Sequence, residues 1–122
     1  MSSNPDIFGG DNAESHYDEG LTASLRGDVT TATRHFEAAI RLDTSLASAY
    51  HQLGKCYART GEHERAIKIL GQVTGKRPKL TAARIDLGNT FILMQKYEHA
   101  IQNFQHVLNT EPGNNKALIG LA

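Results

Sequence analysis

The chain has 122 residues, and its 13 lysines and arginines balance 13 aspartates and glutamates, so the formal net charge is zero. No overall charge attracts nucleic acid or an anionic membrane, and the longest apolar run, residues 91–94, is far short of the roughly 20 residues that cross a bilayer. The single cysteine, Cys56, cannot form an internal disulfide, and the start of the chain lacks a secretory signal, so we predict a cytoplasmic protein without nucleic-acid or membrane partners.

Residues 1–12 form a segment that is poor in apolar side chains. It contains one proline, two glycines and several small polar residues, with Ile7-Phe8 as its apolar pair. A helix in this segment would have no face to bury, so we expect a disordered leader.

A helical pattern follows the leader. Asn12 or Asp11 suits the N-cap of a helix that extends to about Arg26, before the Gly-Asp pair at 27–28. In the next helix apolar residues recur at helical spacing, at Val29, Ala32, Phe36, Ala39 and Ile40. Charged residues fall on the opposite side, which indicates one buried and one solvated face. The hydroxyls of Thr44 and Ser45 are expected to cap the following helix, which begins near residue 47.

The same plan occurs twice more and then begins again. The expected helices lie near residues 47–60, 63–76, 81–94 and 97–109, followed by a start at 115–122. The basic segment 76–79 lies where a helix ends before a proline. Cations complement the helix dipole there, and we prefer this interpretation to a nucleic-acid or targeting motif.

Residues recur along the chain with a period of 34, which is the mark of a repeat protein. One unit carries Tyr50, Leu53, Gly54, Tyr57, Gly61, Ala66, Leu70 and Pro78, and the next carries Arg84, Leu87, Gly88, Phe91, Ala100, Phe104 and Pro112. Two helices can approach closely only where small residues meet. We therefore expect crossings at Gly20, Gly54 and Gly88 of the first helices and at Ala32, Ala66 and Ala100 of the second.

This pattern resembles the tetratricopeptide repeat family over about 110 of the 122 residues. The resemblance implies an all-α fold, a right-handed α-solenoid of antiparallel helix pairs. It divides the chain into repeats at 13–46, 47–80 and 81–114 and a truncated first helix of a fourth at 115–122.

The first repeat departs from the family pattern. Glu19 stands where leucine is expected, His16 and Ala23 replace aromatic residues, and Thr44 replaces the proline. A terminal repeat loses apolar consensus residues where it has no outer neighbour, so we interpret repeat one as an N-terminal cap.

By resemblance to the family, the first helix of each pair lines a concave groove that contacts a segment of another protein. Helical spacing then nominates as groove residues Tyr17, Leu21, His51, Gln52, Lys55, Arg59, Ile85, Asn89, Ile92 and Leu93. The groove would be apolar at both flanks and basic at Lys55 and Arg59, which suits an amphipathic or acidic-apolar partner segment. An alternative is that some of the lining side chains, Leu25 and Leu93 especially, pack between adjacent first helices.

A subclass of the family clamps the C-terminal carboxylates of heat-shock chaperones with lysines, asparagines and an arginine. The corresponding positions of this chain hold Tyr17, Leu21, Gln52, Ala82 and Asp86. None is a cation, and Asp86 would repel a carboxylate, so we do not expect chaperone tails as partners.

The motifs of catalysis and metal binding are not found. No two of the six histidines lie three or four apart with a third ligand nearby, and Cys56, expected in the core, has no CxxC partner. We predict a non-catalytic interaction scaffold without metal or cofactor. Two alternatives stay open: a regulatory or substrate-recruiting arm of a larger enzyme, and self-assembly through residues 115–122, whose leucines have no successor helix.

Overall fold

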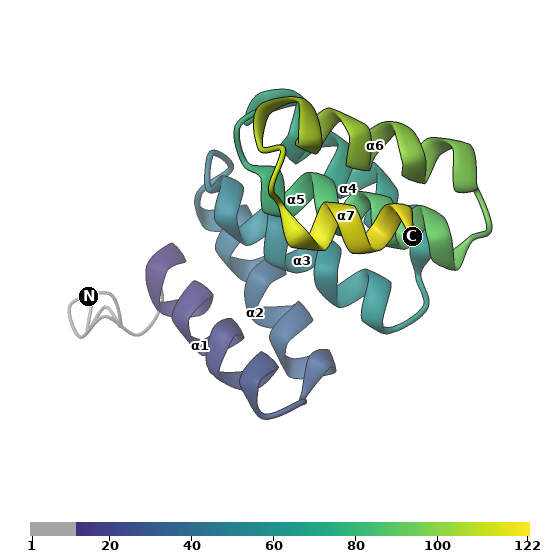
Figure 1. Cartoon of the computed structure of the whole chain (residues 1–122). Coiled ribbons are helices and arrows are strands. Elements are labelled where there is room, and N and C mark those ends of the chain that lie inside the picture. The colour runs from purple at the N-terminus through teal and green to yellow at the C-terminus, as the bar shows by residue number, and fades with distance from the viewer. Residues whose placement is uncertain (1–11) are drawn as a thin grey trace, which may run out of the picture.

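The computed structural model describes residues 12–122, which form helices joined by short turns and contain no strand (Figure 1). The leader predicted for residues 1–12 falls outside the described residues except for Asn12, which caps the first helix. The helices are α1 (Ala13–Leu25), α2 (Val29–Leu42), α3 (Ala47–Arg59), α4 (His63–Lys76), α5 (Thr81–Leu93), α6 (Tyr97–Thr110) and α7 (Asn115–Leu121). Each expected helix is present, with ends within one or two residues of the prediction.

The helices form successive antiparallel pairs, α1 with α2, α3 with α4 and α5 with α6, and α7 packs on α6. Each second helix also contacts the first helix of the next pair, so the pairs stack along one axis, as Figure 1 shows. The first helices α3, α5 and α7 contact one another in turn, whereas α2, α4 and α6 make no comparable contacts within the described range. The stack therefore curves with its first helices on the inner side.

Glycines on the first helices allow the close crossings. An added Cβ would lie 2.6 Å from Phe36 at Gly20, 2.6 Å from Leu70 at Gly54 and 2.8 Å from Phe104 at Gly88. The predicted crossings are confirmed, because no larger side chain fits between these backbones and the fully buried side chains opposite.

Three helices begin at a side-chain cap. The carboxamides of Asn12 and Asn114 and the carboxylate of Asp28 accept hydrogen bonds from backbone N–H groups of the first turn. The expected cap of α3 at 44–45 is wrong, because Leu46 occupies the N-cap position and has no capping side chain. The Ser45 hydroxyl and backbone N–H instead donate to Asp43, which lowers the pKa of that carboxyl.

Two buried clusters form a continuous core along the stack. One extends from α1 to α5 and includes Phe36, Tyr57 and Leu70; the other joins α5, α6 and α7 around Phe104. Cys56 belongs to the first cluster, as predicted, and burial raises the pKa of its thiol. No helix within residues 12–122 has the length and apolar character needed to span a membrane.

Candidate functional site

The inner surface carries two adjacent hollows at the N-terminal ends of α3 and α5. We call the first, of about 700 Å³, the Tyr17 hollow; it is lined by Tyr17, Ala47, Ser48, His51, Gln52, Lys76, Arg77, Pro78, Lys79 and Leu80. We call the second, of about 580 Å³, the Asn89 hollow; it is lined by His51, Lys55, Thr81, Ala82, Ile85, Asp86, Asn89, Asn114, Asn115 and Lys116. His51 borders both hollows, so they form one interrupted groove.

A histidine–carboxylate pair separates the two hollows. His51 Nε2 on α3 lies 2.6 Å from Asp86 Oδ2 on α5, and the His51 residue is only 9% exposed. The pair links the first helices of neighbouring repeats and satisfies the polar atoms that face each other there. His51 was predicted to contact a partner; the structure places it between helices with one edge toward each hollow.

A second polar contact joins the first helices further along. The Arg59 guanidinium on α3 donates to Ser24 Oγ on α1, with Nη1 and Oγ 3.2 Å apart. Arg59 is exposed, so its remaining donors face solvent. The side chain is held near the groove while keeping its charge available.

The predicted groove residues divide into two sets. Ile85 is buried in the cluster around Phe104. It and His51 therefore expose little surface to a partner. The remaining eight are half-buried or exposed: Tyr17, Leu21, Gln52, Lys55, Arg59, Asn89, Ile92 and Leu93. The alternative of packing inside the protein is wrong for Leu25 and Leu93, whose side chains are 90% and 61% exposed. Other lining side chains do pack against the buried clusters: Tyr17, Leu21 and Ile92.

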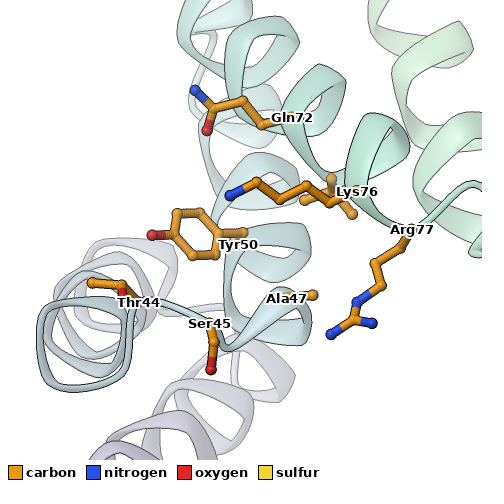
Figure 2. A pocket seen from close by; sticks show the side chains of 8 residues that line it. Thr44, Ser45, Ala47, Tyr50, Gln72, Lys76 and Arg77 are labelled. Carbon is orange, nitrogen blue, oxygen red and sulfur yellow. The ribbon is translucent and has the colours of Figure 1, made fainter.

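The basic segment 76–79 was not among the predicted groove residues, yet three of its cations line the Tyr17 hollow. Lys76 lies in the last turn of α4, as the helix-end interpretation predicts. Lys76 and Arg77 also line a third hollow of about 310 Å³, behind the first, which we call the Tyr50 hollow. Figure 2 shows Lys76 extending toward the Tyr50 ring, whereas Arg77 does not reach that ring. The helix topology could have predicted this position. Because α4 runs antiparallel to α3, the connection from α4 to α5 must lie beside the N-terminal end of α3, where the Tyr17 hollow is.

The comparisons with known proteins identify the repeat. A family model described as "Anaphase-promoting complex, cyclosome, subunit 3" matches residues 26–107. The chain belongs to this tetratricopeptide repeat family.

A curated relative is DnaJ homolog subfamily C member 3 of Gallus gallus, which is 29% identical over 103 residues. The match covers 84% of this chain and 20% of the relative, so this tetratricopeptide repeat chain spans about a fifth of the length of the relatives it first matches.

Solved tetratricopeptide structures show the same fold. The crystal structure of MamA superposes with a TM-score of 0.87 at 23% identity, over 94% of this chain and 67% of that one. The second tetratricopeptide domain of human RPAP3, determined with the HSP70 peptide SGPTIEEVD, gives a TM-score of 0.83 at 26% identity, over 89% and 91% of the two chains. The fold is therefore the predicted right-handed α-solenoid, with three repeats and the start of a fourth.

Proposed function

We propose that this chain is a protein-interaction module whose inner groove binds an extended or helical segment of a partner protein. The observation that carries the proposal is the pair of adjacent hollows that share His51. Both are lined by apolar side chains together with lysines, and the Tyr17 hollow also has an arginine. The peptide in the human RPAP3 structure supports a protein or peptide partner, because that domain is similar to this chain over most of its length.

The Tyr17 hollow favours a partner segment that is both acidic and apolar. Its apolar surface comes from Tyr17, Ala47, Pro78 and Leu80, and its cations are Lys76, Arg77 and Lys79. No aspartate or glutamate of residues 12–122 lines it. An apolar side chain of the partner would enter the hollow while a neighbouring carboxylate pairs with the cations.

The Asn89 hollow favours a polar backbone rather than a second apolar anchor. Side-chain amides line it at Asn89 and Asn115, and its cations are Lys55 and Lys116. Asn114 also lines it, but its amide caps α7 and donates to Glu111. Amides can donate to and accept from a peptide backbone, which gives affinity without requiring one sequence. Its carboxylate, Asp86, is bonded to His51 and so is partly satisfied within the chain.

The proposed partner is not the C-terminal tail of a chaperone. Ala82 and Asp86 line the Asn89 hollow at two of the positions where the clamp needs cations. A terminal carboxylate there would face Asp86 and find no cation at position 82. The peptide SGPTIEEVD tests this directly, and we expect no binding at concentrations where the RPAP3 domain binds it.

The experiment is a binding measurement with matched charge variants. The purified chain is first screened against tiled peptides from disordered protein segments, and an acidic-apolar hit is labelled for fluorescence anisotropy. Lys76→Glu with Lys79→Glu should weaken binding by more than about tenfold, because two charge-assisted contacts are lost. The control, Lys68→Glu with Lys96→Glu, makes the same charge change at exposed positions that line neither hollow.

The control pair should leave the affinity within about twofold of the parent chain. Equal weakening by both pairs would show that only net charge matters and would refute the groove. A library without acidic-apolar hits would refute the partner chemistry. Circular dichroism verifies that all variants remain helical.

A second candidate function is a recruiting or regulatory arm of a larger protein. The observation in its favour is that the match covers about a fifth of the length of the first curated relatives. Sequencing the full reading frame tests it; a catalytic domain in the same frame would support it, and a frame holding repeats alone would exclude it. Non-catalytic character and cytoplasmic location stay predictions.

Self-assembly through α7 is a third proposal, supported by Ile119 and Leu118, which are 73% and 46% exposed. Light scattering across a concentration series measures it directly. A constant monomer mass would exclude it.

A further inference from the structure

A cluster of two histidines and a glutamate lies at the crossing of α1 and α2, away from the groove hollows. His16 Nδ1 lies 3.0 Å from His35 Nδ1, and their ring centroids are 5.3 Å apart. Glu19 Oε2 lies 3.7 Å from His35 Nε2. One ligand atom from each residue lies within 4.8 Å of the other two.

The sequence analysis predicted no metal site because no two histidines lie three or four residues apart with a third ligand nearby. The two histidines come from different helices, 19 residues apart. His16 and Glu19 are two of the departures from the repeat pattern that were attributed to capping. The fold therefore brings these two departures together with a third potential ligand, His35.

The cluster is specific to the first repeat. One period later the three positions hold Tyr50, Leu53 and Ile69, an apolar set. Two periods later they hold Arg84, Leu87 and Asn103, where the Arg84 guanidinium donates to Asn103 Oδ1 at 3.2 Å. A polar contact can thus replace the apolar packing of these positions, but only the first repeat has three metal-ligand side chains there.

We propose that His16, Glu19 and His35 form a binding site for a divalent transition metal, with Zn²⁺ as the best-fitting ion. Two imidazoles and one carboxylate are a ligand set that zinc takes in sites that keep a fourth position open. Magnesium and calcium prefer oxygen ligands throughout and fit this set less well. Water or an external ligand would fill the fourth position.

To hold zinc, the two histidine nitrogens need a small shift and the carboxylate needs to rotate. Zinc lies about 2.0–2.2 Å from nitrogen and oxygen ligands, so two tetrahedral ligands are about 3.4 Å apart. The two imidazole nitrogens already lie 3.0 Å apart. The Glu19 carboxylate lies 3.7 Å from His35 Nε2, the other nitrogen of that ring, so it must rotate toward the Nδ1 atoms to share an ion with them. Its side chain is 53% exposed and has room for this rotation.

The surroundings favour a cation. A hollow of about 320 Å³ beside the cluster is lined by Glu19 and His35 together with Asp18 and Asp28, and it gives solvent access. Arg26 is the one cation in its lining. Bound zinc would join α1 to α2, and α1 makes its main contacts within the described helices with α2 alone. The ion would thus add a second link between α1 and the helix that holds it in the stack.

The competing explanation is a hydrogen bond between the two rings, in which one Nδ1–H donates and the other Nδ1 accepts. Such a bond would link the helices as Arg84 and Asn103 do, without any ion. Zinc binding to the intact chain and to three variants distinguishes the two.

The experiment uses the full chain, freed of metal with EDTA and dialysed, and titrated with ZnCl₂ by calorimetry. We expect one zinc per chain and shifts of the His16 and His35 ring resonances in NMR spectra. At zinc concentrations of about 100 times Kd, Tm should rise by about 10 °C.

His35→Asn is the main variant, because Asn103 occupies the same position in repeat three and the change should preserve folding. It and Glu19→Gln should each weaken zinc binding by more than about tenfold, since even outer partners of metal sites change affinity by that much. His106→Ala removes an exposed histidine elsewhere and should leave zinc affinity unchanged.

Equal affinities of His35→Asn and His106→Ala would show unspecific binding and overturn the proposal. No heat and no Tm change up to about 100 μM zinc would also overturn it, because a preorganised three-ligand site binds zinc more tightly than that. Circular dichroism of His35→Asn confirms that a lost signal is not lost folding.

Discussion

The hydroxyl of Tyr57 connects three helices from a buried position. It donates to Glu37 Oε2 on α2 and accepts from Arg65 Nη2 on α4, each at 2.9 Å. The Arg65 guanidinium also lies 4.2 Å from the centre of the Tyr57 ring. Burial, and then the hydrogen bond to Glu37, raise the pKa of Tyr57 to about 12. The contact thus depends on a protonated phenol.

The raised pKa predicts a loss of stability in alkali. The free energy of unfolding should be independent of this group below about pH 10, the pKa of an unfolded tyrosine, and should fall as the pH rises toward 12. The loss from Tyr57 should reach about 2–3 kcal/mol. Urea unfolding of the parent chain and of Tyr57→Phe at a series of pH values measures it.

Tyr57→Phe should be about 1 kcal/mol less stable at neutral pH, because two hydrogen bonds are lost. Its stability should then fall less steeply than that of the parent chain in alkali. Parallel pH profiles for the two proteins would contradict the prediction.

At the scale of the helix, glycine has opposite effects at different positions of the same pair. Gly54 of α3 faces Leu70 of α4, and an added Cβ would lie 2.6 Å from Leu70 Cγ. Gly75 of α4 has no such neighbour within 4 Å. The first glycine is needed for packing, whereas the second lowers the helix propensity of its segment without a contact to justify it.

The substitution Gly54→Ala should destabilise the chain by about 1–3 kcal/mol, because the fully buried Leu70 cannot move aside. Gly75→Ala is the matched control and should stabilise it by up to about 1 kcal/mol. Urea unfolding of both variants measures the difference. Equal effects in the two variants would mean that the crossing tolerates a methyl group.

At the scale of the molecule, stability is distributed along the stack. Helices α3, α4 and α5 have neighbours on both sides, and their side chains contribute to the buried clusters. Helix α7 has seven residues and leaves Leu118 and Ile119 exposed. A stacked array opens locally where a helix has few neighbours.

Native-state hydrogen exchange should therefore be slowest for the backbone amides of α3, α4 and α5 and fastest for those of α7. Mass spectrometry or NMR can follow the exchange helix by helix. Protection of α7 equal to that of α4 would show that the array opens as a single unit.

The contacts inside one repeat could be predicted from the sequence. The period of 34 places Gly54 opposite the second helix, puts Cys56 in the core and sets the helix ends to within one or two residues. These features follow from helical spacing because both partners lie in one pair, and the short connection between the helices fixes how they meet.

The contacts between repeats and across helices were decided by the tertiary structure alone. The His51–Asp86 pair joins residues 35 apart in neighbouring repeats, and this offset has no sequence signature. The His16–His35 contact lies within the first pair, but histidine is not a residue of the repeat pattern, so the period did not indicate it. Burial of Ile85 likewise depends on how α5, α6 and α7 pack together. The repeated residues determine that the chain forms a curved stack; the rotation between successive pairs decides which variable side chains face one another and which face a partner.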